Sequence, residues 1–437
     1  MMKLILYIVA ILLFAQSAFA TTYYVAPDGS GSDSDSGQCI TDEGACGPWA
    51  TMKHAFEQSV AGDVVYYLAG THTISSLITL YGGTGADGTA ESPITHKAYP
   101  GATVTIVSNV SPFPFDINKN YWTIEDLNFQ GTNGVFRMNN ATTGKPAGWK
   151  FINDTFTLSE YYCTDGGGAI QANSTTADML VDGCTFVGPG TSSCNASVIT
   201  FSTNNIRIQN CDVSGFNNGI YAKHSNDAGD TQSYIKNCYI HDNDAGIRLD
   251  IHDAEISNNL IVDNRLGIQF DTGSGGTISA DNNTFNHNTI YSSTTSVNQE
   301  HSDNGAQYND YRNSIFDTMI QLYPYTSTPH YTTFGYNLYV PSLVIRDYST
   351  SYTLANYQTY LGGCPDADNS CYSYQATPTF VGGATPTTIA GFALTAESVG
   401  YHAASDGDDM GVDVSLVGTN IPPSTVSRGT VPLGNMR

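Results

Sequence analysis

The stretch RIQNCDVSGFNNGIYAK, residues 207–223, is followed by a second version of itself, YIKNCYIHDNDAGIRLD, at residues 234–250. Each version contains a short alternating strand, a polar turn with an Asn-Cys pair, and a second strand that begins near Gly-Ile. A repeat period of about 20 to 30 residues with strand chemistry indicates a solenoid, in which every repeat packs on its neighbours. The two stretches therefore predict two successive coils of a β-solenoid.

The same pattern extends over much of the chain. The residue after the polar turn marks eight positions, separated by 27, 30, 27, 27, 21, 29 and 25 residues: Leu127, Asp154, Cys184, Cys211, Cys238, Asn259, Asn288 and Asn313. Leucine-rich repeats need a regular leucine spacing that is missing here, and propeller blades need about 40 residues or more. We therefore predict an all-β fold, a single-stranded right-handed parallel β-helix.

Equivalent positions of such coils stack on one another. Ile208, Ile235 and Ile256 should form an aliphatic ladder inside the helix. Asn and Cys should stack at a tight turn, where Asn tolerates a left-handed backbone. On this interpretation Cys184, Cys211 and Cys238 are a structural stack, and no Cys/His cluster suggests zinc.

The amino-acid composition limits the kinds of binding partner that we expect for this protein. The 437 residues include 28 tyrosines and only 13% charged residues, which is typical of a large β-protein. With 40 acidic and 16 basic residues, the formal net charge is −24. Such a surface repels nucleic acid and acidic membranes, so we expect neither as a partner. It also repels acidic polysaccharides unless cations bridge the contact.

The N-terminus predicts export. In MMKLILYIVAILLFAQSAFA, residues 1–20, one positive charge at Lys3 precedes an apolar run and a small-x-small cleavage site. This is the pattern of a secretory signal peptide, and the run is short for a membrane span. We expect a secreted protein, extracellular or periplasmic, whose mature chain begins near Thr21.

An exported chain can form disulfides. Cys39 with Cys46 and Cys364 with Cys371 would each close a short polar loop. Cys163 with Cys194 is a third candidate pair.

The beginning of the mature chain predicts a cap. Trp49, Met52, Phe56 and Val60 fall at helical spacing before Gly62-Asp63. A short amphipathic helix there would cover the first coil and its unpaired strand edges.

This opening, YYVAPDGSGSD, then PWATMKHAF and AGDVVYYLAGTHTI, resembles the capping segment of secreted bacterial β-helix proteins of the pectate-lyase-like family. The ending FALTAESVGYHAASDGDDMGVDVSLVG resembles the closing coil of such proteins. The resemblance implies one continuous domain from residue 21, with a cap and first coils to 105, a central helix over 106–320, and C-terminal coils and cap over 321–437. Because the coils stack within one chain, we expect a monomer.

Candidate functional residues come from three segments that align on their glycines: GIYAK (219–223), GIRLD (246–250) and GIQFD (267–271). Strand alternation sends the third and fifth residues of each outward. One outward column is then Tyr221, Arg248 and Gln269, and the other is Lys223, Asp250 and Asp271. Extending the alignment backwards adds three pairs: Gln171 and Asn173, Thr200 and Ser202, Arg137 and Asn139.

The segments after two of these strands carry further candidates. KHSNDAGDTQS adds His224, Asp227 and Asp230, and LDIHDAE adds His252. We take Tyr221, His224, His252, Gln269 and Asp271 as candidate substrate-binding residues.

The resemblance implies a polysaccharide lyase, because that family includes many lyases whose base is a Lys or Arg on such a strand beside Asp-bound Ca²⁺. Lys223 corresponds to that base by position, and Arg248 to a partner of the substrate carboxylate. Asp227, Asp230 and Asp250 correspond to possible Ca²⁺ ligands, since Ca²⁺ prefers carboxylate oxygens. A bound Ca²⁺ would also let an acidic protein hold an acidic polymer.

Other interpretations stay open. Lys223 between aspartates also fits a solvated ion pair, and Arg248 fits a salt bridge to Asp250 or Asp271. A glycoside hydrolase needs two carboxylates beside the scissile bond, which Asp250 and Asp271 would supply. A non-catalytic glycan binder would use exposed tyrosines of the tyrosine-rich segment 308–340.

Overall fold

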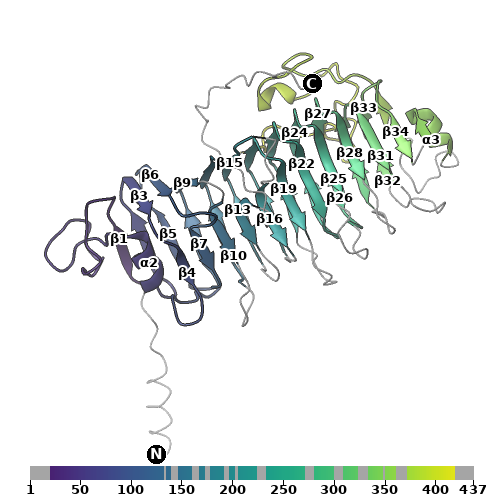
Figure 1. Cartoon of the computed structure of the whole chain (residues 1–437). Helices are drawn as coiled ribbons and strands as arrows, with labels where there is room; N and C mark the ends of the chain where they lie inside the picture. The colour runs from purple at the N-terminus through teal and green to yellow at the C-terminus, as the bar shows by residue number, and fades with distance from the viewer. Residues whose placement is uncertain are drawn as a thin grey trace, which may run out of the picture.

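The computed structural model is an elongated stack of coils, each of which crosses three sheets in turn (Figure 1). It describes residues 20–131, 134–138, 146–159, 167–172, 178–190, 196–201, 205–223, 233–270, 280–299, 309–322, 333–347, 350–360 and 372–418. Within these residues each sheet has twelve strands, and neighbouring strands of one sheet come from successive coils, except for one antiparallel pair at the end of the stack. This path is a right-handed parallel β-helix, so the predicted fold class is confirmed.

We name the sheets A, B and C in the order in which a coil crosses them. Sheet A contains β1 (Thr22–Val25), β2 (Val64–Tyr67), β5 (Ile94–Ala98), β8 (Trp122–Glu125), β11 (Lys150–Ile152), β14 (Leu180–Asp182), β17 (Arg207–Gln209), β20 (Tyr234–Lys236), β23 (Glu255–Ser257), β26 (Thr284–Asn286), β29 (Asp310–Arg312) and β32 (Thr333–Gly335). Sheet B contains β3 (Gly70–Ile74), β6 (Val104–Ser108), β9 (Asn128–Gly131), β12 (Thr155–Leu158), β15 (Thr185–Val187), β18 (Asp212–Ser214), β21 (Tyr239–His241), β24 (Leu260–Val262), β27 (Thr289–Tyr291), β30 (Ile315–Phe316), β33 (Leu338–Tyr339) and β36 (Tyr374–Gln375).

Sheet C contains β4 (Ile78–Leu80), β7 (Phe115–Ile117), β10 (Phe136–Met138), β13 (Gly168–Ala172), β16 (Ala196–Phe201), β19 (Asn218–Lys223), β22 (Ala245–Asp250), β25 (Leu266–Phe270), β28 (Thr295–Gln299), β31 (Met319–Leu322), β34 (Ile345–Asp347) and β35 (Thr350–Tyr352). Only β35 pairs antiparallel, to β34, among the described strand pairs. The helical elements of the described residues are α2 (Met52–Gln58), α3 (Leu354–Tyr360) and the 3-10 turn η2 (Ile389–Phe392).

The interior is filled by ladders of like side chains. The predicted aliphatic ladder is confirmed, because Ile208, Ile235 and Ile256 pair in register and are buried. In the earlier coils of sheet B the same role falls to phenylalanines, with Phe129 and Phe156 stacked 5.2 Å apart between ring centroids. Stacking identical shapes lets each coil fill the space above the last without voids.

Side chains at the turn from sheet A to sheet B form a hydrogen-bonded ladder. Each member accepts a hydrogen bond from the backbone N–H of the member one coil earlier, at 2.9–3.1 Å in Cys238→Asn259, Asn259→Asn288, Asn288→Ser314 and Ser314→Asn337. Asn259 and Asn288 also donate to the buried carbonyls of Ile235 and Ile256, both at 2.8 Å. The turn therefore buries its backbone groups without leaving them unpaired.

The sequence markers follow this ladder except at the last position. Asn313 was taken as the stacked residue, but Ser314 occupies the ladder. Asn313 instead has a left-handed backbone, φ 52°, as do Asn210, Asn237 and Asn258 one residue before their own ladder members. The left-handed residue and the stacked residue are thus neighbours, each suited to a different task.

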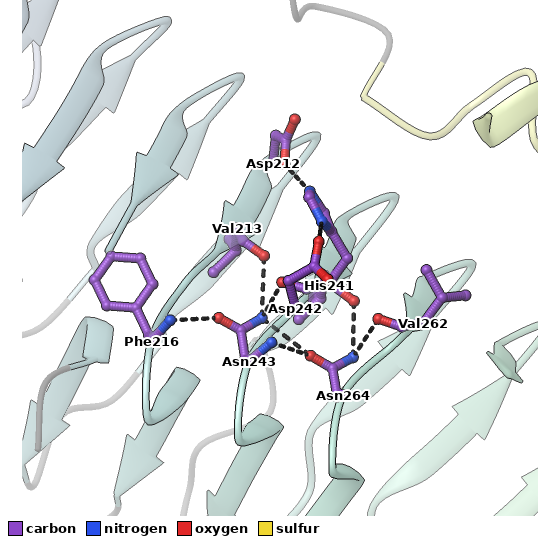
Figure 2. Close-up of polar contacts among 9 residues, drawn as sticks. Asp212, Val213, Phe216, His241, Asp242, Asn243, Val262 and Asn264 are labelled. Atoms are coloured by element: carbon purple, nitrogen blue, oxygen red, sulfur yellow. Dashed lines mark hydrogen bonds and ion pairs between the residues drawn. The ribbon is translucent and has the colours of Figure 1, made fainter. Parts of the chain in front are cut away.

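The other two turns use the same device. Between sheets B and C, Phe216 N donates to Asn243 Oδ1 and Asn243 N to Asn264 Oδ1, both at 2.9 Å (Figure 2). Between sheets C and A, Asn283 accepts from Ala254 N at 3.0 Å and donates its own N–H to Asn309 Oδ1 at 2.9 Å. In these coils, each of the three corners is therefore held by a side chain of the next coil.

Glycine is required at the start of the sheet C strands. A Cβ on Gly219 would clash with the carbonyl oxygen of Gly246 and lie 3.1 Å from Nδ2 of Asn243. The Gly-Ile motif is therefore a packing requirement of the corner between sheets B and C.

The predicted N-terminal helix is present but shorter than its apolar spacing suggested. Within α2, Met52 and Phe56 are buried, and Phe56 stacks on Trp122 at 5.0 Å between centroids. Trp49 lies before the helix in a bridge to Val25, and Val60 is 44% exposed. The helix covers the beginning of the stack (Figure 1).

The chain end departs from the expected closing coil. Residues 376–418, the C-terminal strap, fold back over the outward face of sheet B (Figure 1). The strap buries Phe380, Phe392, Leu394 and Met410 in a second hydrophobic cluster outside the helix, against residues such as Leu260. Two backbone N–H groups of the strap donate to carbonyl oxygens of the left-handed turn asparagines. Gly411 N donates to Asn313 O at 2.6 Å, and Gly418 N donates to Asn237 O at 3.0 Å.

Two cysteine predictions are confirmed. Cys39 and Cys46 form a disulfide, and Cys184, Cys211 and Cys238 are buried free thiols stacked in one ladder. Burial raises the pKa of all three thiols, which suits packing rather than nucleophilic chemistry. The predicted signal peptide, residues 1–20, lies outside the described residues except for Ala20, and so do the predicted pairs Cys163–Cys194 and Cys364–Cys371. No helix of the described part is long and apolar enough to cross a membrane.

One ladder position tests how the corners depend on neutral side chains. Asp154 is fully buried, accepts from Leu127 N at 2.9 Å, and burial raises the pKa of its carboxyl well above the ordinary value. Such a carboxyl stabilises the fold at low pH, and this contribution is lost as pH rises above the ordinary carboxyl pKa of 3.8. Asp154→Asn should raise stability at neutral pH by about 1–3 kcal/mol, with the gain vanishing in acid.

The measurement is denaturant unfolding from acid to neutral pH. Asp42→Asn serves as the control, because Asp42 is exposed and lies in the N-terminal loop, away from this turn. Equal stability of wild type and Asp154→Asn at neutral pH would contradict the assignment.

Candidate functional site

The outward face of sheet C carries one continuous row of side-chain positions along the stack. We call it the outer column of sheet C: Thr79, Asp116, Arg137, Gln171, Ile199, Tyr221, Arg248, Gln269, Asn298, Gln321 and Arg346. A bulge between β28 and β31 leaves the pairing of Asn298 with Gln321 intact. Adjacent members lie about 4.8 Å apart, the spacing of paired strands.

The first predicted column is confirmed. Tyr221 pairs with Arg248 and Arg248 with Gln269, and all three side chains are partly exposed. The guanidinium carbon of Arg248 lies 4.6 Å from the ring centroid of Tyr221, within cation–π distance. The ring therefore orients the charge on this face. The catalytic and binding roles of these residues stay predictions.

Only part of the second predicted column falls in the described structure. The backbones of Lys223 and Asp250 pair directly, as predicted. Asp250 is fully buried, whereas the prediction made it an outward residue available to a metal. Asp271, with His224, Asp227 and Asp230, lies outside the described residues, as do Asn139, Asn173 and Ser202.

One backward extension of the columns was out of register. Thr200 pairs with Ala222, which is buried, and Ile199 pairs with Tyr221. A slip of one residue exchanges the inward and outward faces of a strand. Gln171 and Arg137 are correctly assigned, since Arg137 pairs with Gln171 and Gln171 with Ile199.

A charged group occupies the column in the early coils. Arg137 forms an ion pair with Asp116, and Tyr81 donates its hydroxyl hydrogen to the same carboxylate. The guanidinium of Arg137 lies 5.5 Å from the ring centroid of Phe113. The carboxylate is thus occupied by two donors while part of the arginine remains exposed.

His252 is not a member of the column. It lies in the turn after β22, where its Nδ1 is 2.7 Å from Oδ2 of Asp253. Within the described residues no group of three His, Cys, Asp or Glu side chains is arranged to hold a metal.

Sheet B carries a cluster that the sequence analysis did not single out (Figure 2). His241 Nε2 lies 3.0 Å from Asp212 Oδ1, and Nδ1 lies 2.7 Å from Asp242 Oδ2. The imidazole also stacks on Tyr239 at 4.0 Å between centroids. Asp212 and His241 belong to adjacent coils but not to one register pair, so alignment of the repeats does not bring them together.

The electrostatics of this cluster favour a charged histidine. Burial alone would lower the pKa of His241, but hydrogen bonds to Asp212 and Asp242 outweigh it and raise the pKa to about 9. An imidazolium held by two carboxylates is a stabilising ion pair near neutral pH. The cluster faces away from sheet C, on the face that the C-terminal strap partly covers.

Comparisons with known proteins agree with the fold. Residues 116–290 match the family described as "Right handed beta helix region". No curated protein matches the chain. Among solved structures, pectate lyase Pel9A is 15% identical, with 90% of this chain and 96% of that chain covered and a TM-score of 0.50. XylC in complex with xylose is 11% identical, with 79% and 80% covered and a TM-score of 0.51. At this level of identity, the similarity to these structures shows the fold alone.

The His241 cluster predicts a pH-dependent stability. The pKa is raised from 6.5 to about 9, so the stabilisation is complete below pH 6.5 and is lost as pH rises through 9. We expect a loss of about 3 kcal/mol in total as the pH rises through this range. His241→Asn should remove that part of the pH dependence while remaining folded.

Thermal unfolding across this pH range measures the effect. His402→Asn is the control, because the His402 side chain is 63% exposed and lies 3.6 Å from the carboxylate of Asp409. The assignment fails if wild type and His241→Asn lose stability in parallel.

Proposed function

We propose that this chain, a right-handed parallel β-helix with the fold of the pectate-lyase-like superfamily, cleaves an acidic polysaccharide by β-elimination on sheet C. One observation carries the proposal. The register aligns Tyr221, Arg248 and Gln269 in an outward row beside the backbone pair of Lys223 and Asp250. An aromatic ring, a cation and amide groups in one row are what recognition of a charged sugar requires.

The chemistry assigns one role to each residue. In β-elimination a base removes the proton on C5 of a uronic acid, and the C4–O bond breaks as the C4–C5 double bond forms. Lys223 is the proposed base, since a lysine can accept a proton when a nearby cation or partial desolvation lowers its pKa. Arg248 binds the uronate carboxylate. Its positive charge stabilises the negative charge that builds up next to C5 when the proton leaves. The leaving oxygen takes a proton from water, protonated Lys223 returns the C5 proton to the solvent, and the chain is cut.

Calcium is a separate part of the proposal. When bound, Ca²⁺ would neutralise the uronate carboxylate together with Arg248. Asp227 and Asp230 are the proposed ligands, and carboxylate oxygens are the donors Ca²⁺ prefers. Asp250 is left out of the proposed site because it has no exposed surface.

A hydrolase on the same face is less well supported. It needs two carboxylates in contact with substrate, and Asp250, one of the two candidates, is fully buried. A tyrosine-based glycan binder also loses support, because Tyr311 and Tyr339 of the tyrosine-rich segment are core residues with 0% exposure. The lyase is therefore the function we propose.

We propose that the protein carries out this function as an exported, monomeric enzyme. The disulfide between Cys39 and Cys46 is compatible with an oxidising compartment. Polysaccharide is the partner we propose, and we propose neither nucleic acid nor a membrane.

The test is the ultraviolet absorbance of the new C=C bond on pectate, alginate and glycosaminoglycans. We expect one polymer to respond, and Lys223→Ala to lower the rate at least about a hundredfold. If calcium takes part, a chelator suppresses the reaction in the wild type.

Lys236→Ala is the matched control, because Lys236 lies on sheet A and not on sheet C. It should leave the rate unchanged. New reducing ends without absorbance would indicate a hydrolase, and full activity of Lys223→Ala would exclude Lys223 as the base.

A further inference from the structure

The C-terminal strap is fastened to the corner between sheets A and B by side chains of the helix. Ser405 N donates to Oδ1 of Asn313 at 2.8 Å, and Asp413 N donates to Oδ1 of Asn258 at 2.6 Å. Asn258 donates back through Nδ2 to the carbonyl oxygen of Asp413 at 3.2 Å. Both asparagines have a left-handed backbone, with φ 52°. The residues that turn the chain at this corner therefore also hold the strap.

A histidine takes the place of asparagine in one coil of this corner. His287 lies between β26 and β27 with a left-handed φ of 53°. Its Nε2 is 2.7 Å from Oδ2 of Asp406, and its Nδ1 is 3.2 Å from the carbonyl oxygen of Gly411. The imidazole side chain is 17% exposed and the Asp406 side chain 45%. Both ring nitrogens thus contact the strap.

The two contacts determine how many protons the imidazole holds. A carbonyl oxygen only accepts, so Nδ1 carries a hydrogen, and an ionised carboxylate only accepts, so Nε2 carries one as well. Burial alone would raise the pKa of Asp406, but hydrogen bonds from His287 and from the backbone outweigh it and lower the pKa below its ordinary value of 3.8. The carboxylate is therefore ionised above that pH, and the contact needs a positively charged imidazole.

The neighbouring charges have partners of their own. The other charged groups on the elements that meet here are Asp408, Asp409, Asp413 and His402 on the strap, and Asp310 and Arg312 on β29. Arg312 is paired with Asp310 at 2.6 Å, and His402 lies 3.6 Å from Asp409. Asp413 accepts from the hydroxyl of Ser415 at 2.7 Å. Asp406 is the carboxylate in contact with His287.

We propose that the contact between His287 and Asp406 is a pH-sensitive clasp, which holds the C-terminal strap closed while the imidazole is charged and releases it when the imidazole loses a proton. The neutral ring keeps one N–H for two acceptors, so a nitrogen lone pair then faces either the carboxylate or the carbonyl oxygen. Release uncovers the apolar outward residues of sheet B, Leu260, Val262, Ile315 and Leu338. Because the strap lies on sheet B, the clasp is independent of the reaction proposed on sheet C.

The sign of the pH dependence follows from the two partners. Asp406, whose pKa is lowered, contributes fully above pH 3.8, and this contribution is lost only as the pH falls below that value. The imidazole contributes while it is charged, so its contribution is lost as the pH rises. The clasp is therefore closed in mild acid and opens toward alkaline pH.

Hydrogen–deuterium exchange of the strap amides measures the clasp, because local opening exposes them to solvent. Rates are divided by those of an unstructured peptide of the same sequence, which removes the intrinsic pH dependence of exchange. In the wild type we expect the protection of residues 405–418 to fall about tenfold between about pH 5 and about pH 8, the effect of one partly exposed charged hydrogen bond. At both pH values it should stay below that of β23 in the core.

His287→Asn introduces the residue found at this corner in neighbouring coils, as at Asn258 and Asn313. Its strap should have the same low protection at both pH values, while β23 shows that the variant is folded. His402→Asn is the matched control, because His402 is the other histidine at this turn of the strap and should leave the fall in protection unchanged.

Three results would exclude the clasp. The first is a wild-type strap whose protection does not change with pH. The second is a pH dependence that persists in His287→Asn or disappears in His402→Asn. The third is equal protection of the strap and β23, which would mean that the strap does not open separately from the helix.

Discussion

The hydrogen bonds between a corner side chain and the backbone of the previous coil are the interaction on which this structure depends. A coil that turns three times buries backbone N–H groups that no strand partner reaches. Asn259, Asn243 and Asn283 each accept from such a group, one at each of the three corners. Because each bond joins equivalent positions of two coils, it also sets their register. The straight outer column of sheet C is a consequence of that register.

Much of the fold was predictable because the corners leave a local signature. Two short motifs lie within one coil and recur from coil to coil: a left-handed Asn followed by a stacked Asn or Cys, and Gly-Ile at the start of a sheet C strand. Where these residues change, the prediction slipped: Ser314 replaces Asn in the ladder, and the segment around Thr200 has no Gly-Ile to align. The C-terminal strap was missed because its contacts with sheet B span more than a hundred residues, as in Val412 N on Thr289 Oγ1.

The candidate site was predictable to the same extent. Register alone brings Tyr221, Arg248 and Gln269 together, since strand alternation decides the face and stacking decides the neighbours. The burial of Asp250 and the pairing of His241 with Asp212 depend on packing between coils, which a repeat alignment does not contain.

The most direct test of the account is a crystal structure of the Lys223→Ala protein with a bound oligogalacturonate. The account predicts a sugar chain parallel to the axis of the stack, on the outer column of sheet C, with a uronate carboxylate hydrogen-bonded to Arg248. A chain bound on sheet A or sheet B, or one that crosses the coils at right angles to the axis, would contradict it.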